Sequence, residues 1–175
     1  MINYVYPLMG IAQSAGAFLS YFVIFADHGF YPSQLRGVRE KWDSPYVDDV
    51  QDSLGQHWTY KQRMELQLTV HTYFFVAIVV AQWANLVVCK TRRLSVFAHG
   101  LKNDFLTFSL FFETALATLL AYVPFCNTVF LTRPGLFHWY FPALPFALWL
   151  LLFDEARKCV VRRWPGCPID KLTNY

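Results

Sequence analysis

The chain has 175 residues, of which 55% are hydrophobic, 19% are aromatic and only 15% are charged. Soluble proteins carry about 25% charged residues, so this composition argues against an ordinary soluble domain. The net charge of +3 is small and the basic residues fall in short clusters, which suits a membrane surface rather than nucleic acid.

The first predicted element is a membrane-spanning helix over residues 4–26, within the uncharged stretch Met1–Ala26. It lacks the basic start of a secretory signal. Gly10 and Gly16, with the alanines and serine near them, give this helix a small-residue surface on which other helices can pack closely. A first span without a basic flank also suggests that the chain is part of a longer one.

A polar loop over residues 27–63 separates this helix from a second span, predicted at 64–89. Leu66–Cys89 contains no Asp, Glu, Lys or Arg. About 20 apolar residues in a helix cross the hydrocarbon core of a bilayer, so this stretch is long enough to span it. The basic cluster Lys90–Arg93 ends the span. The alternative is a buried core helix of a soluble protein.

Two further spans are predicted at 104–123 and 137–154. We therefore expect an all-α polytopic membrane protein with four transmembrane helices and a ~37-residue extracellular loop between the first two. Basic residues place the loop 90–103 and the tail 155–175 in the cytosol, and the loops 27–63 and 124–136 outside. Of the four cysteines only Cys126 is then extracellular, which excludes an extracellular disulfide within the chain.

Several polar side chains inside the predicted spans are costly to bury in lipid: Gln13, His71, Gln82, Asn85 and Glu113. An ionisable group in the bilayer is costly and commonly functional, so Glu113 is the strongest candidate. Gln82 and Asn85 are three residues apart and share a helix face, where their oxygens could join Glu113 in binding a hard cation. The alternatives are a protonated glutamate bonded to a neighbouring helix, and amides that hold helices together.

The sequence contains no P-loop, no Asp-Lys-Thr-Gly, no HExxH and no GxSxG, and its cysteines lack zinc spacing. We therefore predict no catalytic residue, no metal centre, no cofactor in this chain and no enzymatic activity of its own. Arg92-Arg93-Leu94-Ser95 fits a basophilic kinase pattern, which makes Ser95 a candidate phosphosite, although such short matches also arise by chance.

The chain resembles the C-terminal end of the sodium/potassium-transporting P-type ATPase alpha subunit family, with the gastric proton/potassium pump as a close relative. The resemblance covers nearly the whole chain and the last four of the ten helices of that family. It is carried by Ala15–Pro32, Gly55–Arg63, Ala81–Phe97, Glu113–Tyr122 and Phe153–Gly166.

The resemblance implies partners and location. In the family, a Ser-Tyr-Gly-Gln signature in the first outer loop binds a single-span beta subunit. Here the matching residues are Ser53, Leu54, Gly55 and Gln56, so tyrosine is replaced by leucine and altered or weaker binding is implied. Other implied partners are the rest of the alpha subunit, the lipid bilayer and a small single-span regulator on the third helix; the implied location is the plasma membrane.

The resemblance also implies a cation site. Asn85 stands where the family has an aspartate that helps to bind a third sodium ion, so the oxygen is kept and the charge is lost. Glu113 matches the glutamate assigned to the same site, and Gln13 matches a polar position near the ion sites. Ser95 matches the kinase serine of the family. The family ends in two tyrosines that tune sodium affinity, and this chain ends in Asn174-Tyr175, so only Tyr175 is kept.

These features predict the C-terminal membrane support domain, residues 1–175, of a pump that exports sodium and imports potassium. The ATP and magnesium sites of that pump belong to domains that this chain lacks. One rival is a stand-alone four-span subunit or assembly modulator that binds beta subunits without pumping. A second rival is a self-sufficient channel or carrier, which a single intramembrane acid supports poorly.

Overall fold

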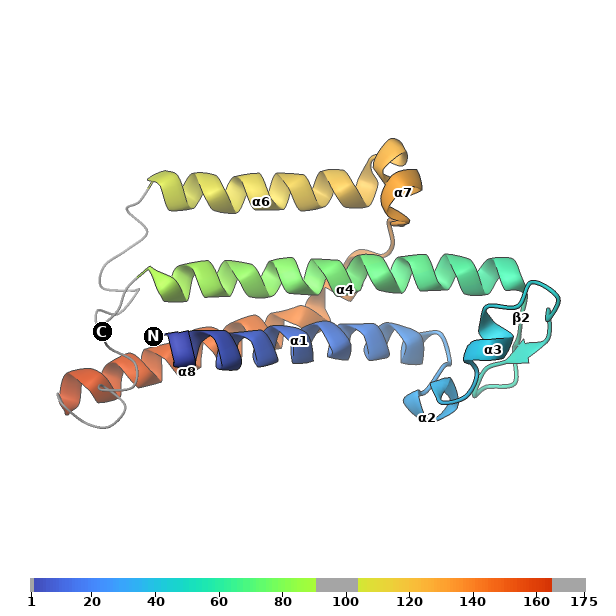
Figure 1. Ribbon diagram of the computed structural model, residues 1–175, viewed down its shortest axis with the longest axis horizontal. Coiled ribbons are helices and arrows are strands. Elements are labelled where there is room, and N and C mark those ends of the chain that lie inside the picture. The colour runs from blue at the N-terminus through green and yellow to red at the C-terminus, as the bar shows by residue number, and fades with distance from the viewer. Residues whose placement is uncertain (1, 91–103, 165–175) are drawn as a thin grey trace.

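Four long helices form the body of the protein in the computed structural model, which describes residues 2–90 and 104–164. They are α1 (Ile2–Asp27), α4 (Tyr60–Cys89), α6 (Asp104–Tyr122) and α8 (Leu144–Arg163). Successive long helices run in opposite directions, and α4 lies between α6 on one side and α1 and α8 on the other (Figure 1). The predicted all-helical architecture is confirmed.

Three of these helices are long and apolar enough to cross a membrane: Met9–Asp27 within α1, Tyr60–Cys89 and Asp104–Tyr122. The region predicted as the fourth span, 137–154, is divided between a 3₁₀ helix, η1 (Phe137–Ala143), and α8. Helix α8 continues to Arg163, nine residues beyond the predicted end, and its second half carries most of its charge. A fourth span therefore stays a prediction.

The loop after α1 has structure of its own at one end of the molecule (Figure 1). It contains the short helices α2 (Pro32–Leu35) and α3 (Arg39–Trp42) and a small antiparallel hairpin of β1 (Val50–Gln51) and β2 (His57–Trp58). The connection after α6 contains α7 (Pro124–Phe130), which begins with proline at its first turn and ends at Leu131 in the left-handed conformation, φ 53°.

Helix α4 begins at Tyr60, four residues before the predicted start, because of a capping box. The Thr59 side chain accepts a hydrogen bond from the Gln62 backbone N–H, and the Gln62 side chain accepts one from the Thr59 backbone N–H. These bonds satisfy two backbone donors at the helix end. They extend α4 into polar sequence that hydropathy alone assigns to the loop.

The core lies where α1 and α8 pack on α4, around the fully buried side chains of Ile24, Val70 and Leu150. A methyl group added at Gly16 of α1 would lie 3.1 Å from the Phe146 side chain of α8. Glycine therefore permits this close approach of the two helices, as the small-residue surface predicted.

The loop between α1 and α4 is fixed to the helices by one aromatic cluster and one buried cation. The Trp42 ring centre lies 5.6 Å from that of Phe25 and 5.1 Å from that of Phe30. Arg63 is fully buried in α4 and donates hydrogen bonds to the carbonyls of Ser44, at 3.0 Å, and Trp58, at 3.5 Å. The loop and the first turns of α4 therefore form one packed unit.

Helix α6 is the least buried of the long helices. In its most apolar stretch 17% of the residues are buried, whereas the figure for α4 is 50%. Its phenylalanines at 105, 108, 111 and 112 are 60–78% exposed. An apolar helix surface of this kind is stable in lipid, which agrees with a membrane location.

Candidate functional site

The hairpin between α3 and α4 displays the four residues that the sequence singled out for partner binding. Val50 pairs with Trp58 and Gln51 with His57, so the residues between the strands form the tip. Leu54 at this tip is 67% exposed. Gly55 follows it with φ at +80°, a conformation that glycine adopts without steric cost.

Asp52 fixes the shape of the hairpin from inside. Its Oδ1 accepts hydrogen bonds from the backbone N–H groups of Leu54, at 2.9 Å, and Gln56, at 2.8 Å, and its Oδ2 accepts one from the Trp58 indole at 3.1 Å. The side chain is almost completely buried. Burial opposes ionisation, but the bonds from Gln56, Trp58 and Leu54 outweigh it, so the pKa of Asp52 lies below its ordinary value.

The tip is also tied to the end of α1. The Ser53 backbone N–H donates to the Gly29 carbonyl at 2.9 Å, and the Ser53 hydroxyl donates to the Gln34 side chain at 2.8 Å. Ser53 and Gln56, the first and last of the four residues, are thus held by hydrogen bonds, while Leu54 and Gly55 are exposed at the surface. Leu54 and Gly55 therefore form a small exposed tip that its neighbours hold in one shape.

The three polar residues assigned to a cation site lie on three different helices. Asn85 is half-buried on α4, Gln13 is half-buried on α1 and Glu113 is half-buried on α6. The Asn85 amide donates to the Gln82 side chain at 3.4 Å and its oxygen accepts from the Cys89 thiol at 3.5 Å, so the predicted shared face of Gln82 and Asn85 is present.

Within residues 2–90 and 104–164, no hydrogen bond joins Gln13, Asn85 and Glu113, and no three His, Cys, Asp or Glu side chains lie close enough to hold a metal ion. The Gln13 Nε2 and the Trp83 Nε1 are buried and have no hydrogen-bond partner in this part of the chain. A buried donor needs a hydrogen-bond acceptor. Gln13 of α1 and Trp83 of α4 can therefore each still donate to an oxygen atom.

A charged cluster that the sequence did not single out joins α8 to the end of α4. Lys158 is fully buried, pairs with Asp154 at 2.5 Å and donates to the Val88 carbonyl of α4 at 3.3 Å. Arg157 donates to Asp154 at 2.8 and 2.9 Å. The sequence signal for this cluster is the spacing of three and four residues from Asp154 to Arg157 and Lys158. This spacing places all three side chains on one face of a helix.

Two predicted regulatory residues, Ser95 and Tyr175, lie outside the described residues. Cys126 is buried and Cys89 and Cys159 are exposed, and all three are free thiols.

Comparison with known proteins gives the family. Residues 1–160 match the family described as "Cation transporting ATPase, C-terminus". The chain is also 47% identical over 175 residues to the sodium/potassium-transporting ATPase subunit alpha of Tetronarce californica. That alignment covers all of this chain and 17% of the length of the relative. The chain therefore belongs to the family of cation-transporting ATPase C-terminal regions.

Proposed function

We propose that the chain is the membrane support region of a sodium/potassium-type ATPase alpha subunit and takes part in sodium export and potassium import as part of that pump. The observation that carries this proposal is the 47% identity over the full 175 residues. The packed unit of α1, α4 and α8 braces the transport helices of the remaining subunit. Hydrolysis of ATP with magnesium belongs to that remaining part, and this chain is not itself an enzyme.

In this proposal the protein is a multi-pass protein of the plasma membrane with four spans and both ends in the cytosol. The apolar part of α8, together with η1, provides the fourth span. The short apolar length of α8 and the charges in its second half support a C-terminal end at the membrane surface. The exposed phenylalanines of α6 face lipid or a small single-span regulator.

The hairpin tip, Ser53 to Gln56, binds the single-span beta subunit. The exposure of Leu54 and the anchoring of its neighbours support this role. Co-purification of the chain with a tagged beta subunit from co-expressing cells tests it. Leu54→Tyr should increase the captured fraction, because tyrosine adds contact area and a hydrogen-bonding group at low entropic cost.

Tyr46→Ala is the matched control, because Tyr46 lies in the same loop, is 95% exposed and is outside the hairpin. It should leave capture unchanged. If neither the unsubstituted chain nor the Leu54→Tyr variant is captured, the result contradicts beta-subunit binding at this tip.

The cation site uses Asn85, Glu113 and Gln13, with transported sodium as its ligand. The half-buried side chain of Gln13 and the amide pair of Gln82 and Asn85 support a polar environment inside the helices. The site is completed by residues from the remaining subunit. Loss of the carboxylate at Asn85 reduces the charge that faces the ion and weakens its binding.

The second candidate is a stand-alone four-span subunit that binds beta subunits without pumping. The observation in its favour is the continuous buried core that α1, α4 and α8 form within this chain. The two candidates differ in whether the chain occurs inside a larger polypeptide.

A further inference from the structure

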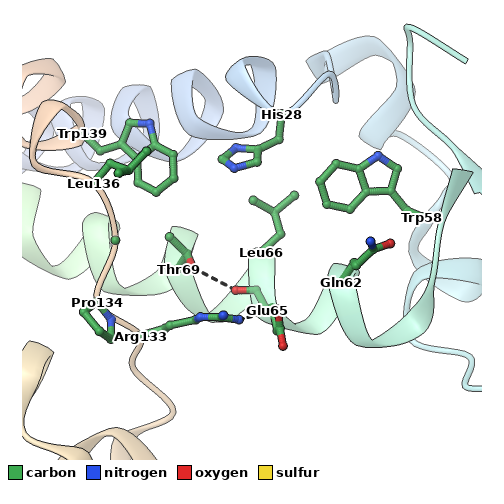
Figure 2. Close-up of a pocket in the computed structure, with 11 residues that line it drawn as sticks. His28, Trp58, Gln62, Glu65, Leu66, Thr69, Arg133, Pro134, Leu136 and Trp139 are labelled. Carbon is green, nitrogen blue, oxygen red and sulfur yellow. Dashed lines mark hydrogen bonds and ion pairs between the residues drawn. The ribbon is translucent and has the colours of Figure 1, made fainter. Parts of the chain in front are cut away.

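A cleft of about 480 Å³ opens beside the hairpin, at the end of the molecule where α1 ends and α4 begins. Its walls come from the end of α1, the first three turns of α4, and the segment between α7 and η1 (Figure 2). The volume falls within the range of about 300–1,000 Å³ that is typical of small-molecule sites.

Three aromatic rings form one wall of this cleft. The His28 ring centre lies 5.1 Å from that of Trp139 and 6.2 Å from that of Trp58. Figure 2 shows His28 between the two indoles. The ring planes are inclined by 53° and 68° to that of His28. Clusters of aromatic rings of this kind bind quaternary ammonium groups.

Both indole N–H groups are already committed to carboxylates, which fixes the rings. Trp139 donates to Asp27 and Trp58 donates to Asp52, each at 3.1 Å. Each carboxylate also adds electron density to the indole to which it is bonded, and this strengthens the attraction of the ring face for a cation. These two indole N–H groups are therefore not available to donate to a ligand at this wall.

The opposite wall is charged. The Arg133 guanidinium lies 2.7 Å from the Glu65 carboxylate, and both side chains are about 40% exposed to solvent. Figure 2 places these two side chains across the cleft from the aromatic rings. An arginine that is partly exposed has donors left for a phosphate oxygen after it pairs with Glu65.

We propose that this cleft binds a phosphocholine group, with its quaternary ammonium against Trp58, Trp139 and His28 and its phosphate at Arg133. A trimethylammonium group has no N–H donor, so aromatic faces suit it better than hydrogen-bond acceptors. The group can come from a bilayer lipid or from a soluble ester. The position of Glu65 in the second turn of a membrane-length helix favours the lipid.

The test uses the full chain purified in a maltoside detergent and titrated calorimetrically with dihexanoyl phosphatidylcholine below its micelle concentration. Dihexanoyl phosphatidylglycerol is the matched probe, because it keeps the phosphate and the acyl chains but lacks the ammonium. The proposal requires saturable binding of the choline lipid that is at least about fivefold tighter than that of the glycerol lipid. Equal binding of the two lipids would overturn it.

Soluble phosphocholine distinguishes the two sources of the group. If it competes with the choline lipid at a similar concentration, the site reads the headgroup alone and accepts a soluble ester. If it competes only at a much higher concentration, the acyl chains contribute and a bilayer lipid is the natural ligand. Both results support phosphocholine recognition, whereas no competition at any concentration would contradict it.

Two variants locate the site independently. Trp58→Leu should weaken binding of the choline lipid about fivefold, while Trp58→Phe keeps a ring and most of the affinity. Arg133→Gln should weaken binding by a similar factor. This variant keeps the bond from the residue 133 backbone N–H to Thr72, at 2.8 Å, and loses only a partly exposed ion pair with Glu65. Trp149→Leu, on the exposed face of α8, is the control. Unchanged affinity in both Trp58→Leu and Arg133→Gln would overturn the proposal.

Discussion

Lys158 of α8 donates a hydrogen bond to the backbone carbonyl of Val88, 70 residues earlier in the last turn of α4. The same ammonium pairs with Asp154, and both side chains are almost fully buried. A cation is favourable at a helix C-terminus, where carbonyl groups lack partners. This contact therefore joins α8 to α4 at one end of the bundle.

Replacing Lys158 tests this contact. Lys158→Met should lower the free energy of unfolding by about 3 kcal/mol, the low end for breaking a buried ion pair, because Arg157 still compensates Asp154. The measurement is an unfolding titration in mixed micelles followed by circular dichroism. Lys41→Met, at an exposed position of α3, should change stability by less than about 0.5 kcal/mol. Equal effects of the two variants would show that the buried contact does not stabilise the fold.

The hairpin should open in acid. Because the pKa of Asp52 is lower in the folded chain than in the unfolded chain, its ionised form stabilises the fold above pH about 4, and this stabilisation is lost as the pH falls further. Hydrogen–deuterium exchange should then give smaller protection factors for residues 50–58 below that pH, once the rates are corrected for the intrinsic pH dependence of amide exchange. Asp52→Asn should exchange faster at neutral pH and lose this pH dependence; an unchanged acid response in this variant would assign the response to another group.

Gly29 and Gly37 provide a matched pair of backbone tests. Both have positive φ angles, +87° and +95°, so alanine costs about 1–2 kcal/mol of backbone strain at either position. Only at Gly29 does the added methyl also meet a neighbour, the Asp52 carboxylate at 2.7 Å. Gly29→Ala should therefore expose the hairpin to limited proteolysis much more than Gly37→Ala. Equal cleavage would mean that the Gly29–Asp52 approach is not tight in solution.

Asn85→Asp tests the cation site in a pump alpha subunit that ends in this chain. The restored charge should raise the apparent sodium affinity roughly fivefold and change its voltage dependence, because a charged oxygen binds a cation more strongly than an amide. Asn85→Ala should not raise the affinity. If Asn85→Asp leaves affinity and voltage dependence unchanged, Asn85 is not part of a sodium site.

Much of the fold could be predicted because the bilayer imposes a simple pattern on sequence. The uncharged stretch Leu66–Cys89 and the basic cluster after it set the end of α4, and Tyr122–Pro124 set the end of α6. The start of α4 required the Thr59–Gln62 capping box, which is a local signal that hydropathy does not contain. The end of α8 required the ion pairs of Asp154 with Arg157 and Lys158, which stabilise a helix in polar sequence.

The sites were less predictable because they depend on contacts between distant segments. The hairpin signature could be found from sequence, but the role of Asp52 could not, since its partners become visible only when the turn is formed. The aromatic wall combines His28, Trp58 and Trp139, which lie far apart in the chain. No periodicity within one element indicates that such rings meet.

The most direct test of the central claim is the size of the polypeptide that contains this sequence. Native membranes would be probed by immunoblot with an antibody against residues 90–102. The proposed pump subunit predicts a band about six times heavier than the 20.4 kDa of this chain, since the chain covers 17% of its relative. A single band near 20.4 kDa would contradict that account and would favour a stand-alone membrane subunit.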